Sequence, residues 1–97
     1  MESKRLIEID TLRRYYQIEV SFVYSLHDYG LIPFVEQEGK VFIEEDDIVE
    51  VERMMRLHYD LEINMAGIDA ISHLLKRLKE SQDTLLRLRS RYRPEDF

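Results

Sequence analysis

Carboxylates dominate the segment between residues 19 and 47, and they decide which chemistry this part of the chain can do. Eight acidic residues stand against one base, Lys40, with His27 taken as neutral. They are Glu19, Asp28, Glu36, Glu38, Glu44, Glu45, Asp46 and Asp47. A surface that binds a nucleic-acid duplex neutralises phosphates with Lys and Arg. This segment therefore repels phosphate, and we expect its partner to be a protein.

The other chemically capable side chains do not combine into a site. The three histidines are far apart in the sequence and no cysteine accompanies them, so we expect no metal centre. The carboxylates at 44–47 lack the spaced ligands and turn glycine of a calcium loop. The glycines are isolated, which argues against a phosphate-binding loop, and no Ser or Thr has a His partner at triad spacing. We expect no catalytic residue, no cofactor and no small-molecule substrate.

The composition indicates one small globular protein. The chain has 97 residues, of which 44% are hydrophobic and 35% charged. Its formal net charge of -6 gives no general reason to bind nucleic acid or an anionic membrane. The first ten residues lack the apolar stretch of a secretory signal, and no apolar run is long enough to span a bilayer. We expect a cytoplasmic protein.

Two short helices are predicted before Pro33. The first covers 11–17, with Asp10 or Thr11 as its N-cap, and the second covers 20–29 and ends at Gly30. Two short helices joined by a tight corner are typical of a helix-turn-helix. Four aromatic side chains of these helices are expected in its core: Tyr15, Tyr16, Phe22 and Tyr24.

A hairpin and a third helix follow. Residues 34–36 and 40–43 are β-prone and flank a loop that contains Gly39, which is the pattern of a small wing. The carboxylates at 44–47 favour the first turn of a helix, because they lie at the positive end of its macrodipole. Its apolar stripe continues to about Asp60, and Asn64 is the expected N-cap of a final long helix.

The final helix carries a heptad seam that predicts a homodimer. Apolar residues recur at spacings of three and four, with Ser81 as the one polar member, and Pro94 ends the helix. The predicted dimerisation residues are Ile71, Leu74, Leu78, Leu85, Leu88 and Tyr92. Residues 76–93 also hold seven bases against two acids. These bases can pair with acids of the same chain or of a second copy, and contact with nucleic acid is the alternative.

The arrangement resembles the MerR family of helix-turn-helix regulators. Asp28-Tyr29-Gly30-Leu31-Ile32-Pro33 is similar to the family's Y-x-x-G-L-I-x-P corner, with a shorter spacing. Glu45-Asp46-Asp47-Ile48 is similar to the Y-x-x-x-D-[ILV] start of its third helix. The resemblance implies a mainly α fold: a winged helix-turn-helix with a small β-hairpin over 1–63, a dimerisation helix over 64–93 and a tail over 94–97.

A narrower resemblance points to the chaperone-modulator branch, the CbpM-like proteins. Residues 53–68 resemble the branch pattern R-x-x-R-L-x-x-x-L-x-[IL]-[ND]-x-x-G-[IV], and the likeness extends from Leu6 to Tyr92. It implies a non-enzymatic protein that binds the J-domain of a DnaJ-like co-chaperone and holds it inactive. The chain also departs from the DNA-binding regulators, because residues 20–29 contain no Lys or Arg.

The J-domain partner would present a basic helix, so acidic residues with apolar neighbours are the candidates to bind it. The candidate partner-binding residues are Tyr24, Asp28, Tyr29, Phe34, Glu44, Glu45, Asp46, Asp47 and Glu50. Two alternatives remain open. One is a MerR-type DNA-binding transcriptional regulator that uses Arg13, Arg14 and the basic terminal helix. The other is a dimeric adaptor for an unrelated basic protein.

Overall fold

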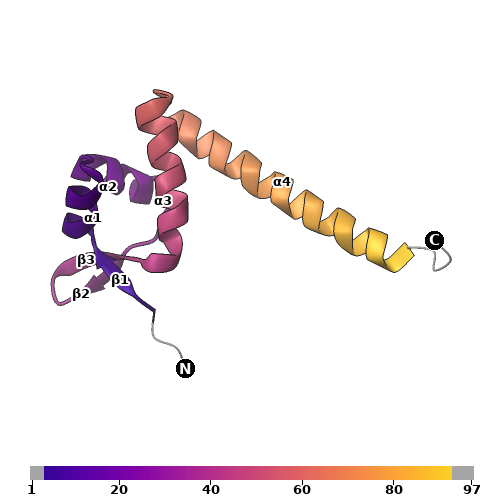
Figure 1. The fold of residues 1–97 in the computed structure, drawn as a ribbon, viewed down its shortest axis with the longest axis horizontal. Helices are drawn as coiled ribbons and strands as arrows, with labels where there is room; N and C mark the ends of the chain where they lie inside the picture. The colour runs from indigo at the N-terminus through magenta and orange to yellow at the C-terminus, as the bar shows by residue number, and fades with distance from the viewer. Residues whose placement is uncertain (1–3, 93–97) are drawn as a thin grey trace.

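Short elements form a winged domain, and one long helix leaves it (Figure 1). The computed structural model describes residues 4–92. Helix α1 spans Ile9–Tyr16 and α2 spans Val20–Asp28, with Gln17 in the left-handed region (φ 56°) between them. Gly30 has a φ of 74° and donates its N–H to the carbonyl of His27, which confirms the predicted glycine cap.

The start of α1 differs from the prediction. Extended Glu8 precedes the helix and no side chain caps it, so the expected capping by Asp10 or Thr11 is wrong. Asp10 lies inside the first turn, where its carboxylate pairs with Arg13 and Arg14 at 2.6 and 3.4 Å. Backbone pairing of the preceding strand sets where α1 begins, and that pairing has no local sequence signal.

Three antiparallel strands form the sheet, in the order β1-β3-β2. Strand β2 (Val35–Gln37) and β3 (Lys40–Glu44) form the predicted hairpin. Its turn residues Glu38 and Gly39 both have positive φ, as a tight two-residue hairpin turn requires. Strand β1 (Leu6–Glu8) was not predicted, and it pairs with the other edge of β3.

The third helical segment is divided rather than continuous. Glu45–Asp47 form a 3₁₀ turn, α3 covers Ile48–Met55, and a π-helical turn covers Arg56–Asp60. The predicted break follows, and the Asn64 Oδ1 atom accepts the N–H of Gly67 at 2.8 Å. This bond confirms Asn64 as the N-cap of α4, which spans Met65–Tyr92.

The core lies between α1, α2, α3, the sheet and the start of α4. The buried apolar side chains are Ile9, Leu12, Ile18, Phe22, Val23, Leu26, Ile32, Ile43, Val51, Met54, Met55 and Ile68. Phe22 is in the core as predicted, and Tyr16 packs against it. The placement of Tyr15 and Tyr24 in the core is wrong, because they are 79% and 42% exposed. Tyr15 follows Leu12 by three positions but lies at the edge of the buried stripe, which turns its ring to solvent.

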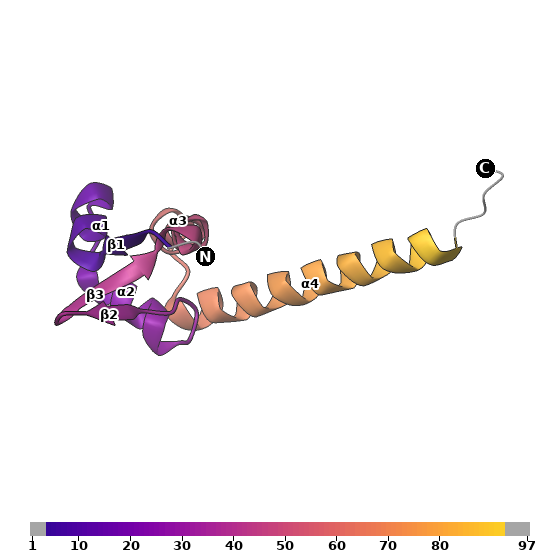
Figure 2. The same ribbon diagram turned by 90° about the horizontal axis from the view of Figure 1, so that it is seen from below.

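Helix α4 extends far beyond this core (Figures 1 and 2). Ile68 anchors its first turns and is completely buried, whereas every residue from 73 to 91 is exposed. A helix of this length spans about 42 Å. Within the described residues, no helix is long and apolar enough to cross a membrane.

Candidate protein-binding surfaces

An aromatic patch, formed by Tyr24, His27 and Phe34, lies where α2 meets the segment before β2. The rings of His27 and Phe34 stack with centroids 4.0 Å apart and planes at 7°, and Tyr24 meets Phe34 edge-on at 5.3 Å. The His27 Nδ1 atom lies 3.1 Å from the carbonyl oxygen of Ile32, which holds the ring in place. These contacts give α2 an ordered, partly exposed apolar surface, of the kind that anchors a partner.

Of the predicted partner-binding residues, Tyr24 and Phe34 are thus brought together. Asp28 and Tyr29 are exposed at the end of the same helix, with Tyr29 44% exposed. Sequence reasoning missed His27, because its role depends on Phe34 returning to α2 after Pro33. No sequence pattern predicts that two rings seven positions apart will stack.

An acidic cluster, Glu44 to Asp47, occupies the end of β3 and the 3₁₀ turn before α3. Lys4 lies 3.6 Å from the Glu44 carboxylate and 3.8 Å from that of Asp46, and Arg5 lies 3.9 Å from that of Glu45. The two bases were missed because β1 was missed. Side chains so exposed form weak ion pairs that exchange readily with other charges.

Among residues 4–92, Asp47 forms no ion pair, and its environment is unfavourable for a negative charge. Burial raises the pKa of Asp47 above its usual value, and the neighbouring carboxylates of Glu44 and Asp46 raise it further. An incoming cation would relieve this repulsion. The cluster therefore keeps an electrostatic preference for a basic ligand despite Lys4 and Arg5.

The aromatic patch and the acidic cluster lie at the same end of the sheet. Val35 of β2 pairs with Phe42 of β3, so Phe34 is level with Ile43, one residue before Glu44. On the other edge of β3, Leu6 pairs with Glu44. The register thus places Phe34 and the start of the acidic cluster at the same end of the sheet.

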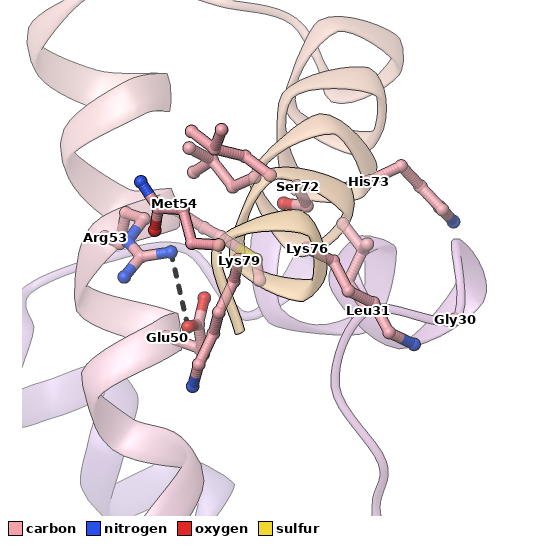
Figure 3. Close-up of a pocket in the computed structure, with 12 residues that line it drawn as sticks. Gly30, Leu31, Glu50, Arg53, Met54, Ser72, His73, Lys76 and Lys79 are labelled. Atoms are coloured by element: carbon pink, nitrogen blue, oxygen red, sulfur yellow. Dashed lines mark ion pairs between the residues drawn. The ribbon is translucent and has the colours of Figure 1, made fainter. Parts of the chain in front are cut away.

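Glu50, the last predicted partner-binding residue, has a different setting. Its carboxylate pairs with Arg53 at 3.3 Å, and both side chains line a groove between α3 and α4 (Figure 3). Gly30 and Leu31 also line this groove, and Lys76 and Lys79 project from α4. Glu50 also helps to raise the pKa of Asp47, which precedes it by three positions at the start of α3.

The seam residues of α4 form a second candidate surface. Leu74, Leu78, Leu85 and Leu88 are 60%, 53%, 59% and 41% exposed, and Ile71 is partly exposed. The Tyr92 side chain lies outside what the structure describes. Two further exposed leucines were missed, Leu75 and Leu86, because neither falls on the heptad seam. Several exposed leucines on one helix are typical of association surfaces, so α4 stays a candidate for one.

The bases assigned to DNA binding in the alternative interpretation are partly engaged. Arg13 donates a hydrogen bond to Asp10 at 2.6 Å, and this bond lowers the pKa of the Asp10 carboxyl. Arg14 pairs with the same carboxylate. The described residues contain no group of three metal-ligating side chains; His58 stacks on Phe22, and His73 lies beside Asp69.

Comparison with known proteins agrees with this architecture. The family model described as MerR HTH family regulatory protein matches residues 7–90, which include α1, α2, the sheet, α3 and nearly all of α4. No curated protein and no solved structure is significantly similar to the chain. The mainly helical fold, with its small sheet and long C-terminal helix, is that of a MerR-like helix-turn-helix. The chain belongs to the MerR helix-turn-helix family of regulatory proteins.

Proposed function

We propose that this protein is a non-enzymatic chaperone modulator, which binds the basic helix of a J-domain co-chaperone and inhibits it. The observation that carries the proposal is the acidic cluster, Glu44 to Asp47, next to the aromatic patch at one end of the sheet. A basic helix satisfies both, because its Lys and Arg heads meet carboxylates while its apolar side chains meet Tyr24 and Phe34.

The raised pKa of Asp47 supports a cationic partner. A carboxylate crowded by Glu44 and Asp46 gains more from an approaching base than an isolated one does. Lys4 and Arg5 hold part of the cluster through exposed contacts of 3.6 to 3.9 Å. A partner with several bases on one helix would displace such contacts at little cost.

The test compares two charge-matched variants for binding to a purified J-domain at low salt. Asp46→Asn with Asp47→Asn should weaken binding about tenfold, which corresponds to roughly 1.4 kcal/mol. Glu36→Gln with Glu38→Gln removes the same charge from the exposed wing and should change binding less than about twofold. Equal effects, or an unchanged affinity in the first variant, would contradict the proposed site.

Inhibition of the J-domain co-chaperone must be measured separately from binding. The wild-type protein should reduce the stimulation that the J-domain co-chaperone gives to the ATPase of its heat-shock chaperone, and the Asp46/Asp47 variant should reduce it less. A protein that binds the J-domain without affecting that stimulation would be an adaptor instead of an inhibitor.

We further propose that the active form is a homodimer, paired through α4. The exposed leucines of the seam require cover, and a second copy offers the same surface. Changing Leu78 and Leu85 together to Asp should give monomers. Sedimentation that still shows a dimer would remove this part of the proposal.

A DNA-binding regulator is the second candidate, and the basic residues of α4 are the observation in its favour. Residues 76–92 hold six bases against two acids. Duplex binding by such a surface should be measurable at low salt and fall steeply as salt rises. Without that dependence, this candidate is excluded.

A further inference from the structure

Two helical segments of the winged domain end in the same way, and a histidine holds each end. His27, near the end of α2, places its Nδ1 atom 3.1 Å from the carbonyl oxygen of Ile32. His58, in the π-helical turn after α3, places Nδ1 at the same distance from the carbonyl oxygen of Ile63. In both segments one residue between the histidine and the isoleucine has a positive φ, which lets the chain turn after the helix. The shared geometry makes His58 an internal reference for His27.

The two histidines differ in what surrounds their rings. His58 is half-buried, because it stacks on the buried ring of Phe22 and Tyr59 meets it edge-on at 4.8 Å. His27 is exposed and stacks on Phe34 in the aromatic patch. Holding a helix end is sufficient to explain His58. The exposed ring of His27 is also available to another molecule.

The bond to Ile32 determines where the proton lies on the His27 ring. A carbonyl oxygen can only accept, so Nδ1 must carry a proton and donate it. In the neutral ring Nε2 then has an unshared electron pair and can only accept. Within residues 4–92, Nε2 of His27 forms no hydrogen bond. Because the stack on Phe34 also holds the ring, this free acceptor is ordered before any partner arrives.

The charges around His27 favour a cationic donor. Asp28 directly follows it and is exposed, and residues 20–29 contain no Lys or Arg. A carboxylate on a partner would be repelled by Asp28, whereas a base would be attracted. Lys and Arg side chains donate hydrogen bonds and never accept them, so they are the chemical complement of a free Nε2 acceptor.

We propose that His27 is a specificity-determining residue of the aromatic patch, whose Nε2 atom accepts a hydrogen bond from a Lys or Arg side chain of the partner's basic helix. The rings of Tyr24 and Phe34 give that helix an apolar contact, which many apolar side chains would satisfy. The acceptor on His27 instead requires a donor at one place, and a partner without it would bury Nε2 unpaired. The inference rests on the proposed function, because it names how the J-domain helix is selected.

Two substitutions separate the roles of the two ring nitrogens. The amide nitrogen of His27→Asn replaces Nδ1 and can still donate to Ile32, but nothing replaces Nε2. The amide of His27→Gln reaches the place of Nε2 and can accept there, but it leaves the Ile32 carbonyl without its donor. His27→Asn should weaken J-domain binding about tenfold or more, and His27→Gln less than about threefold. The thermal midpoint should follow the opposite order, with His27→Gln the less stable of the two.

His58 offers the matched control, because His58→Asn and His58→Gln alter the same kind of helix end away from the patch. Phe22, on which His58 stacks, lies about 200° around α2 from Tyr24. Both His58 variants should change J-domain binding less than about twofold, while their thermal midpoints follow the same order as those of the His27 pair. If affinity follows the thermal midpoint in the His27 pair, His27 acts only through stability and the proposal is overturned.

Long-range proton–nitrogen correlation spectra of the imidazole rings test the contact without substitution. At about pH 8, where imidazole is neutral, the free protein should show Nε2 of His27 unprotonated. Adding the J-domain should shift the Nε2 resonance of His27 and leave that of His58 in place. A proton on Nε2 in the free protein, or an unmoved resonance in the complex, overturns the proposal.

The binding measurements distinguish the two levels of the argument. A wild-type protein that binds no J-domain contradicts the proposed function, and the role of His27 with it. A wild-type protein that binds the J-domain, with His27→Asn and His27→Gln weakened equally, contradicts the role of His27 alone.

Discussion

The Tyr16 hydroxyl donates a hydrogen bond of 2.5 Å to the Glu52 carboxylate, and this bond joins α1 to α3 across 36 positions of sequence. The bond raises the pKa of Tyr16 to about 12, with partial burial as the second cause. The hydroxyl must keep its proton to donate, so the neutral form is the one that stabilises the folded state.

A pH dependence follows from this bond. The folded pKa of about 12 lies above the unfolded value of 10.0, so the contribution is complete below pH 10 and is lost as pH rises toward 12. Tyr16→Phe should lower the free energy of unfolding by about 1 kcal/mol at neutral pH. It should also abolish the decrease in stability between pH 10 and pH 12. Denaturant unfolding across the pH range measures both effects. Tyr15→Phe is the control, because Tyr15 is 79% exposed, and it should change neither quantity.

The Asn64 cap should contribute measurably to the start of α4. Its Oδ1 atom satisfies the N–H of Gly67, so Asn64→Ala should lower the free energy of unfolding by about 1 kcal/mol. Asn64→Ser keeps an acceptor at the same place and should retain most of that stability. If Asn64→Ser lowers the free energy of unfolding as much as Asn64→Ala does, the capping hydrogen bond is not the source of the stability.

Gly67 should respond to alanine in the opposite way from an ordinary helical glycine. Alanine normally stabilises an exposed helix by up to about 1 kcal/mol. Here an added Cβ would lie 2.7 Å from Ile63 Cγ2 and 3.2 Å from Asn64 Oδ1, so Gly67→Ala must displace Ile63 or disturb the cap. We expect a lower thermal midpoint. A rise in the midpoint would show that Ile63 moves aside without cost.

The charged carboxylate of Asp47 should destabilise the folded state at neutral pH. Its raised pKa means that the charged form is disfavoured by folding, so stability should increase as pH falls through that raised pKa toward the usual 3.8. Asp47→Asn should stabilise the fold at neutral pH by about 0.5 kcal/mol and weaken the acid dependence. Asp46→Asn is the control, since Asp46 lies 3.8 Å from Lys4 and loses a partner instead. Destabilisation by Asp47→Asn would refute this interpretation of its surroundings.

Local signals in the sequence were sufficient for much of this protein. The Gly30 cap and the Asn64 cap depend on residues within a few positions of one another, and each lies where predicted. The hairpin turn was predicted over residues 37–39 and is one residue shorter, because Gln37 pairs with Lys40 in the sheet. The helical span of α4 follows from its period, because a 3.6-residue repeat needs no distant partner. The acidic character of the candidate surface was equally plain from composition.

Tertiary structure alone decided how those parts combine. Strand β1 exists because the outer edge of β3 is free to pair with it, and this pairing brings Lys4 and Arg5 to the acidic cluster. The Tyr16–Glu52 bond and the stack of His27 on Phe34 likewise join separate elements. Three residues of strand carry too little local preference to be recognised, and a contact across many positions depends on where the whole chain has folded. The sequence thus determined the elements and their charge, whereas the packing of these elements decided which charges meet.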